Sequence, residues 1–385
     1  MGTGGFIGKA GLMKYFIIAG EQSGDLHGSN LIRELIRSDN NTEVICWGGD
    51  LMESAGARLL KHYRETAFMG FTAVVKNIMS IRRNLKLCKE QIIEHNPDVV
   101  VLIDYPGFNL RIAEFSSREG FKVFYYISPK FWAWNEGRVK KVKKYVSRMF
   151  IILPFETEFY CKHGIRVEYH GNPLVDEIEK KRSQMARASE ILSSLQLDGR
   201  PVIALMAGSR RHEVENILPV MVKTVKHFPD YQFVLTGVKN ISDGIYSKIL
   251  GDAPVTMIRE KTYEILSVAR AAIVKSGTST LEAALFGVPQ VVCYRNDFLT
   301  MLLSWFVIRV RFISLVNLIV NREIVRELLQ YSVTEKNLVR ELNALLPGGS
   351  KRQIILEGYR ELGDKLGPAG ASARIAREML KELKG

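Results

Sequence analysis

The chain repeats one local pattern: a short run of aliphatic residues, a loop of small or polar residues, and a helical segment. The run Val99–Ile103 has five consecutive aliphatics, as expected of a parallel strand that is buried on both faces. In the second half, Ala271–Val274 leads through Ser276-Gly277-Thr278 into an Ala/Leu-rich segment that ends at Gly287. Because neighbouring parallel strands need a crossover that is usually a helix, this alternation predicts an α/β fold.

The length of 385 residues predicts two domains, at roughly 150 residues each. A polar, helical stretch from Glu177 to Gly199 separates the two alternating halves. We expect a Gly-rich, disordered lead-in over residues 1–13, a first Rossmann-like domain over 14–176 and a second over 177–350. Residues 351–385 are expected to form C-terminal helices that can pack back on the first domain.

The formal net charge of +13 implies an anionic partner. Nothing resembles a zinc module or an aromatic-studded RNA-binding strand, so we expect no nucleic acid, and a phosphorylated substrate or an acidic membrane surface is favoured. The four cysteines share no CxxC spacing, which argues against a disulfide framework or a zinc site. No apolar run reaches the roughly 18 residues of a membrane-spanning helix.

The turn Ser276-Gly277-Thr278 is a candidate phosphate site. A strand-to-helix turn leaves the first backbone N–H groups of the helix unpaired, with the positive end of the helix dipole behind them. Glu282 follows about one helical turn after Thr278, which suits it to accept hydrogen bonds from a ribose. The strand-like run Pro201–Met206 also leads into a loop of small residues, and Arg210 in that loop is placed to clamp a phosphate. The alternative is that Ser276 caps a helix and that Ser279 and Glu282 form a local hydrogen-bonded pair at its start.

Polar loops also follow strand-like runs in the first half. Asp104 stands where the run Val99–Ile103 ends, before a Pro-Gly loop, and is a candidate general base; an Asx cap on that loop is the alternative. Ser23-Gly24-Asp25 follows the run Tyr15–Gly20, and ligands collect at such strand ends in open α/β sheets. A tight connection that needs Gly24 for backbone reasons is the alternative there.

Residues 68–87 combine large apolar groups with four cations. At helical spacing they give an apolar face bordered by positive charge, which suits an acyl chain or the interface of an anionic membrane. A core helix is the alternative. The residues that we assign to acyl chains or membrane are Phe68, Met69, Phe71, Val74, Val75 and Ile78.

Six groups of residues, in this order along the chain, resemble the lipid-A-disaccharide synthase family from about Lys14 to the C-terminus. They are Ala19-Gly20-Glu21 with Ser23-Gly24-Asp25, Ile103-Asp104 with Phe108-Asn109-Leu110, Ser128-Pro129 with Trp132-Ala133-Trp134, Gly208-Ser209-Arg210 with Glu213, Ser276-Gly277-Thr278 with Leu281-Glu282, and Ser314-Leu315 with Asn317-Leu318. The chain departs from the family pattern at Met206-Ala207, where Leu-Pro is usual, and at Lys275, where a small residue is usual. Lys275 adds a candidate phosphate contact.

The resemblance implies a GT-B fold, in which two Rossmann-like domains face each other across a cleft. It implies an inverting glycosyltransferase that moves the sugar of a UDP-sugar lipid donor, UDP-2,3-diacylglucosamine, to a phosphorylated glycolipid acceptor, 2,3-diacylglucosamine 1-phosphate. The expected product is the β-1′,6-linked disaccharide of lipid A biosynthesis, formed in the cytoplasm at the surface of a Gram-negative inner membrane. The resemblance also suggests a homodimer.

The resemblance and the loop positions together assign the site. Asp104 is expected to be the catalytic base. We assign the nucleotide-sugar site to Gly208, Ser209, Arg210, Glu213, Ser276, Gly277, Thr278, Glu282, Arg295 and Asn317. We assign contacts with the acceptor, or support of its loops, to Ser23, Gly24, Asp25, Asn109 and Trp134. No Asp-x-Asp triplet occurs to hold a divalent ion on the diphosphate, so we expect no metal and no cofactor.

Two alternatives remain open from the sequence. A UDP-N-acetylglucosamine 2-epimerase shares the expected architecture but handles a soluble sugar, for which the apolar and basic stretch of residues 68–87 has no use. A non-catalytic sensor of nucleotides or lipids would bind without releasing UDP.

Overall fold

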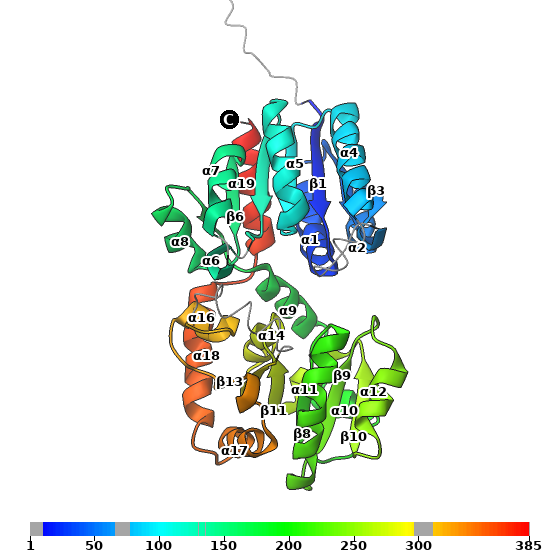
Figure 1. Cartoon of the computed structure of the whole chain (residues 1–385), viewed down its shortest axis with the longest axis vertical. Helices are drawn as coiled ribbons and strands as arrows, with labels where there is room; N and C mark the ends of the chain where they lie inside the picture. Colours follow the sequence, from blue (N-terminus) through cyan, green and yellow to red (C-terminus); the bar gives the residue numbers. More distant parts are fainter. Residues whose placement is uncertain (1–10, 66–77, 130, 135, 296–310, 385) are drawn as a thin grey trace, which may run out of the picture. The chain divides into compact units, whose positions relative to one another are not determined.

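A computed structural model describes residues 11–65, 78–129, 131–134, 136–295 and 311–384. The chain divides into two compact units: Met1–Pro173 together with Gly370–Gly385, and Leu174–Ala369. Figure 1 labels the elements of each unit. The chain therefore leaves the first unit once and returns to it for its last residues. The first strand already begins at Met13, one residue before the expected start of the first domain.

The first unit is built on one seven-stranded sheet in the order β3-β2-β1-β4-β5-β6-β7, with every neighbouring pair parallel. The strands are β1 (Met13–Ala19), β2 (Thr42–Gly48), β3 (Arg58–His62), β4 (Val99–Ile103), β5 (Lys122–Tyr126), β6 (Arg148–Ile151) and β7 (Glu168–Tyr169). The helices are α1 (Gln22–Ser38), α2 (Asp50–Ser54), α4 (Ile78–His95), α5 (Pro106–Arg118), α6 (Phe131–Trp134), α7 (Val139–Tyr145), α8 (Glu156–Lys162) and α19 (Ala371–Lys384), with short 3-10 turns η1 (Tyr63–Glu65) and η2 (Glu136–Arg138).

Both faces of this sheet are covered, which explains why its central strands are continuous aliphatic runs. Successive residues of β1 alternate between two core clusters: Phe16 and Ile18 belong to the cluster on the face of α4 and α5, and Tyr15 and Ile17 to the cluster on the face of α1 and α19. All five residues of β4 are buried. The predicted α/β class is confirmed for this unit.

The last helix, α19, completes the core of the first unit. Its residues Ile375 and Met379 are fully buried in the same cluster as Leu31 of α1. Two ion pairs flank this contact, Arg148–Glu382 at 2.5 Å and Lys384–Asp39 at 2.8 Å. The preceding helix, α18 (Arg352–Leu366), belongs to the second unit, so only α19 crosses back.

The second unit repeats the architecture with a six-stranded parallel sheet in the order β10-β9-β8-β11-β12-β13. The strands are β8 (Val202–Met206), β9 (Gln232–Gly237), β10 (Val255–Arg259), β11 (Ala269–Lys275), β12 (Gln290–Tyr294) and β13 (Glu327–Leu329). The helices besides α18 are α9 (Pro173–Ser183), α10 (Ala188–Ser194), α11 (Arg211–Thr224), α12 (Asp243–Leu250), α13 (Thr262–Val268), α14 (Ser279–Leu285), α16 (Leu315–Val320) and α17 (Glu335–Leu345), with 3-10 turns η3 (Val225–His227) and η4 (Gln330–Ser332).

Each sheet has one point at which the strand order reverses. In the first unit it lies between β1 and β4, where Ala19 pairs with Ile103, and in the second between β8 and β11, where Met206 pairs with Val274. In open α/β sheets, ligands bind outside the carboxyl ends of the strands at such switch points. The loops that carry the predicted site residues Gly208–Arg210, Ser276–Thr278 and Asp104 follow these strands.

None of the helices within the described ranges combines the length and the apolar character that crossing a membrane requires.

Candidate functional site

The turn after β11 presents backbone donors. The N–H groups of Thr280 and Leu281 donate to the carbonyls of Gly277 and Thr278. Within the described part of the chain, we find no acceptor for the N–H groups of Gly277, Thr278 and Ser279. A Cβ added at Gly277 would meet no atom within 4 Å, so the backbone is open to a ligand there.

Ser276 has a structural role in this turn. Its hydroxyl donates to the carbonyl of Ile313 at 2.8 Å, and its backbone N–H donates to Cys293 O at 2.9 Å. In the described part of the chain no side chain caps α14, but the hydrogen bond between Ser279 and Glu282, the other part of the alternative interpretation, is present. These two hydrogen bonds fix the turn at the buried Ser276, while Thr278 is exposed to solvent.

Glu282 lies in the first turn of α14, partly buried next to Tyr263, whose hydroxyl is 3.4 Å from Glu282 Oε1. Burial raises the pKa of Glu282 to about 6, although hydrogen bonds from Tyr263 and Ser279 act in the opposite direction. A carboxylate can accept about four hydrogen bonds, so Glu282 is suited to accept further ones from added hydroxyl groups besides those from Tyr263 and Ser279.

The loop after β8 is shaped by a buried carboxylate. Gly208 has φ +115°, and a Cβ on it would lie 2.5 Å from Glu213 Oε2, so only glycine fits. Glu213 Oε2 accepts the backbone N–H groups of Ser209 at 3.0 Å and Arg210 at 3.3 Å. The side chain of Arg210 is half exposed, with its Nη1 3.9 Å from Glu213 Oε1.

Lys275 lies at the end of β11 and pairs with the same carboxylate, with Nζ 2.5 Å from Glu213 Oε1. Burial alone would raise the pKa of Glu213, but the hydrogen bond and charge of Lys275, with further help from Ser209 N–H and Arg210, hold it below its usual value. Glu213 is therefore ionised at neutral pH and joins the two loops of the switch point.

Asn317 supports the site from inside the second unit. Its amide donates to Val325 O and Glu327 Oε1, both at 2.8 Å, and accepts the backbone N–H groups of Ile324 and Val325. The side chain is fully buried with its capacity used, so we treat this predicted site residue as a support for the loop. No motif pointed to Glu327, which also binds Ser314.

Arg295, another predicted site residue, follows β12 and is partly buried.

In the first unit, Asp104 and Tyr105 both adopt left-handed backbone conformations, with φ +44° and +48°. The carbonyl of Asp104 accepts hydrogen bonds from Tyr125 Oη at 2.5 Å and Asn109 Nδ2 at 2.9 Å. A Cβ on Gly20 would lie 2.3 Å from Tyr105 Cγ, so the loops after β1 and β4 meet. The predicted residues Asp104 and Asn109 are brought together, with Asn109 holding the loop and the Asp104 side chain half buried.

The loop after β1 contains one exposed and two buried predicted residues. Ser23 is exposed, while Gly24 packs against Ala19 with only 3.1 Å for an added Cβ. Asp25 is 3% exposed, and its carboxylate accepts the backbone N–H groups of Gly49 at 2.8 Å and Met52 at 3.0 Å. Asp25, in α1, therefore caps α2, and its role in the structure is to hold α2 against α1.

A buried carboxylate that the sequence did not single out lies under α6. Glu156, 1% exposed, accepts hydrogen bonds from the Ser128 hydroxyl and from the Trp132 indole N–H at 3.0 Å. The backbone of Trp134 ends α6. The partners lie 24 and 28 positions from Glu156, so no local pattern could have revealed the cluster.

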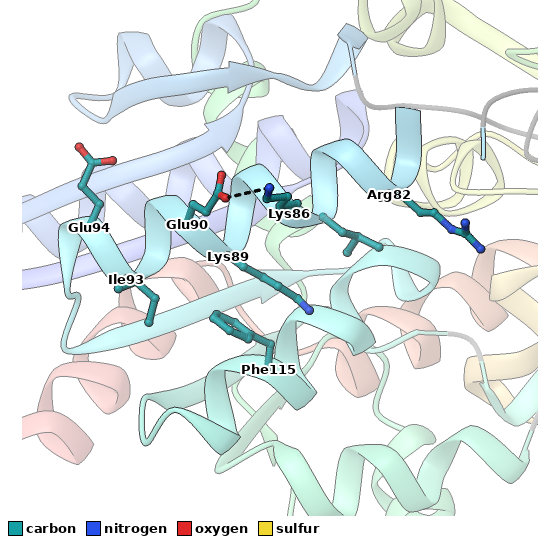
Figure 2. Close-up of a pocket in the computed structure, with 8 residues that line it drawn as sticks. Arg82, Lys86, Lys89, Glu90, Ile93, Glu94 and Phe115 are labelled. Atoms are coloured by element: carbon teal, nitrogen blue, oxygen red, sulfur yellow. Dashed lines mark ion pairs between the residues drawn. The ribbon is translucent and has the colours of Figure 1, made fainter. Parts of the chain in front are cut away.

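The apolar stretch assigned to acyl chains or membrane lies mostly outside the described residues: Phe68, Met69, Phe71, Val74 and Val75 are not described, and Ile78 is the first residue of α4. The structure does describe the rest of α4, which forms an open groove with α5 of about 710 Å³ (Figure 2). Leu85, Ile93 and Phe115 line it, together with the charged residues Arg82, Lys86, Lys89, Glu90 and Glu94.

Charged and apolar side chains lie next to one another along this groove. Lys89 Nζ lies 5.0 Å from the centre of the Phe115 ring, and Lys86 pairs with Glu90 at 3.7 Å (Figure 2). Ile93, an apolar residue of the same helix, is 49% exposed.

The described part of the chain contains no cluster of three or more His, Cys, Asp or Glu side chains that would hold a metal ion.

Two parallel sheets, each with donor-bearing or acidic loops at its switch point, define a class of paired Rossmann-like proteins. The UDP-GlcNAc 2-epimerase of Neisseria meningitidis, solved with UDP-GlcNAc, matches with TM-score 0.70 over 96% of this chain and 100% of that one, at 14% identity. A glycosyltransferase of Rickettsia africae matches with TM-score 0.59 over 96% and 98%, at 12% identity. At these identities the likeness concerns the fold, which is the predicted GT-B type.

Sequence comparison is more specific. The profile of the family described as lipid-A-disaccharide synthetase matches residues 15–373. The lipid-A-disaccharide synthase of Geobacter sulfurreducens is 37% identical over 96% of this chain and 97% of its own length, and that of Coxiella burnetii strain Dugway is 35% identical over 94% and 96%. The chain belongs to the lipid-A-disaccharide synthase family, whose members are glycosyltransferases that form the lipid A disaccharide.

Proposed function

We propose that this chain transfers the sugar of UDP-2,3-diacylglucosamine to 2,3-diacylglucosamine 1-phosphate, giving the β-1′,6-linked disaccharide 1-phosphate and UDP. The observation that carries the proposal is the family match over residues 15–373, which includes every predicted catalytic and nucleotide-binding position. The site geometry supports it, because the loops at both switch points offer the groups that this transfer needs.

The second unit binds the UDP part of the donor. The open N–H groups of Gly277, Thr278 and Ser279 and the half-exposed guanidinium of Arg210 are donors for a diphosphate. Glu282 accepts hydrogen bonds from the ribose. Structures with the same fold, the 2-epimerases of Neisseria meningitidis and Methanocaldococcus jannaschii, were solved with UDP-GlcNAc, which supports a UDP-sugar as the donor class.

Asp104 acts as the general base. It takes the proton from the acceptor hydroxyl as that oxygen bonds to the anomeric carbon, the bond from that carbon to the diphosphate oxygen breaks, and UDP leaves with the electron pair. This single displacement inverts the anomeric carbon. The donors around Gly277 stabilise the negative charge that develops on the leaving diphosphate. No Asp-x-Asp triplet is present, so we propose that transfer needs no divalent metal, and full activity in EDTA is the expected result.

Peripheral contact with an anionic inner membrane is part of the proposal. The support is the α4 groove, where Arg82, Lys86 and Lys89 surround an apolar lining, together with the apolar composition of residues 68–79. Basic amphipathic helices bind anionic lipid surfaces through the burial of apolar area and through electrostatic attraction. A homodimer stays a suggestion of the family resemblance.

The test of the reaction is donor choice. The purified chain is incubated with the acceptor and either the diacylated donor or UDP-N-acetylglucosamine, and UDP is quantified. UDP release only with the acylated donor, and only with acceptor present, supports the proposal. Conversion of UDP-N-acetylglucosamine to its 2-epimer would favour the epimerase, and binding of both ligands without UDP release would favour a sensor.

A further inference from the structure

One carboxylate connects the two loops of the second-unit switch point. Glu213, in the first turn of α11, accepts the backbone N–H groups of Ser209 and Arg210 at 3.0 and 3.3 Å through Oε2. Its other oxygen lies 2.5 Å from Nζ of Lys275, which is 62 positions away and ends β11. The shape of the loop after β8 and the charge at the end of β11 are therefore linked through Glu213.

The pair is shielded from solvent. The side chain of Glu213 is 5% exposed and that of Lys275 is 19% exposed. A carboxylate in such a position is stable only with a cation or several donors beside it. Arg210 is a second cation near this carboxylate; its side chain is half exposed and its Nη1 is 3.9 Å from Oε1. Lys275 is therefore the closest partner of the Glu213 charge.

The Glu213–Lys275 pair lies beside the two loops that are proposed to bind the diphosphate. Lys275 directly precedes the turn Ser276–Thr278, and Glu213 shapes the backbone of Gly208–Arg210, so both phosphate-facing loops start beside it. An uncompensated carboxylate at this point would repel a diphosphate, since like charges at an interface with little water are strongly unfavourable.

We propose that Lys275 is a positioning residue for the donor diphosphate, acting through Glu213: its ammonium neutralises the carboxylate that shapes the Gly208–Arg210 loop and so allows this loop to bind an anion. The inference rests on the proposed nucleotide site and deepens it, since it names how charge is balanced there.

The proposal predicts effects on UDP binding that differ in direction among variants. Lys275→Met leaves Glu213 unpaired and is expected to weaken UDP binding by ~10-fold or more. Lys275→Arg keeps the charge and is expected to bind UDP within about threefold of the wild type. Glu213→Gln leaves the ammonium free for phosphate, and should bind at least as tightly as the wild type. The double variant Lys275→Met, Glu213→Gln is expected to recover most of the loss.

If the Glu213–Lys275 pair only held the two loops together, the variants would give a different pattern of UDP affinities. Glu213→Gln and the double variant would then bind UDP as weakly as Lys275→Met. That pattern overturns the proposal. If Lys275→Met does not fold, Glu213→Gln and the double variant carry the test, since neither buries an unpaired carboxylate. Binding by both within about threefold of the wild type supports the proposal, and a loss of about tenfold or more in either overturns it.

The experiment is calorimetric titration of UDP into the full chain and each variant, with melting temperatures recorded alongside. The control is the exposed pair Arg211–Glu215 on the same helix, 2.8 Å apart, where the matched changes Arg211→Met and Glu215→Gln should leave UDP affinity unchanged. A wild-type chain that does not bind UDP would overturn the proposed nucleotide site itself, whereas wild-type binding with the wrong variant pattern overturns only the role of Lys275.

Discussion

At the scale of single residues, the first-unit loop is defined by the adjacent left-handed residues Asp104 and Tyr105. Such a conformation costs about 1–3 kcal/mol per non-glycine residue and persists where neighbouring contacts enforce it. Tyr125 and Asn109 do so here by binding the Asp104 carbonyl. These contacts fix the backbone of Asp104 directly after β4, where the proposed general base lies.

Asp104→Asn is expected to fold normally and to slow sugar transfer by at least ~100-fold, the lower end for general acid–base catalysis. The amide preserves shape but cannot accept a proton. Initial rates of UDP release at saturating substrates measure the effect, with Glu119→Gln, an exposed carboxylate in the same unit, as the matched control. Turnover within a few-fold of the wild type would remove Asp104 from the role of base.

UDP affinity should depend on the ionisation of Glu282. Its pKa is raised to about 6 by burial, and donors from a ribose favour the ionised form, so bound UDP lowers that pKa. Binding therefore weakens as pH falls through 6, by about tenfold between pH 7 and pH 5 from this group alone.

Glu282→Gln provides the baseline for that measurement, because a terminal phosphate of UDP also titrates near pH 6 and contributes equally to both proteins. Calorimetric affinities at several pH values should give a steeper profile for the wild type than for the variant. Parallel profiles would mean that Glu282 does not accept hydrogen bonds from the nucleotide.

At the scale of elements, much of the fold could be predicted, because strands that are buried on both faces of a parallel sheet consist of continuous runs of aliphatic residues. Val99–Ile103 and Ala271–Val274 both lie within strands at switch points, and the loops after them carry the predicted Asp104 and Ser276–Thr278. What could not be predicted depends on partners distant in sequence. Asp25 caps a helix 24 to 27 positions away, and Asn317 is held by Glu327 through a turn whose geometry appears only in the folded unit.

Helix α4 is expected to contribute to membrane binding through its cations. Arg82→Gln with Lys89→Gln should weaken binding to vesicles that contain anionic phospholipid by about 2 kcal/mol, since each cation near such a surface contributes ~1 kcal/mol. Vesicle sedimentation at low ionic strength measures it. The matched control removes two exposed cations of α19, on the opposite face of the sheet, through Arg377→Gln with Lys381→Gln. Equal losses in both double variants would contradict a specific role for α4.

At the scale of the whole molecule, the chain closes its first unit with its last helix. The residues of α19 that face α1 are as buried as the central strands, so the first core is complete only when residues 371–384 are in place. The sequence predicted helices that can pack back but not that α18 and α19 belong to different units. Both are amphipathic, and only the surfaces that they meet distinguish them.

Met379→Ala should destabilise the first unit by about 2–5 kcal/mol, the usual cost of truncating a fully buried methionine. Urea unfolding followed by tryptophan fluorescence reports mainly on this unit, because it contains Trp47, Trp132 and Trp134. Lys381→Ala, on the exposed side of the same helix, is the control. A loss below about 0.5 kcal/mol for Met379→Ala would show that α19 is not integral to this core.

The proposed reaction is a single displacement, with Asp104 as the base and UDP, held by the second unit, as the leaving group. The most direct test is the structure of the lipid product formed from both acylated substrates, determined by mass spectrometry and by the anomeric coupling in NMR spectra. We predict a β-1′,6-linked disaccharide 1-phosphate, with one UDP released per product. An α-linked product, or UDP release without any disaccharide, would contradict the account.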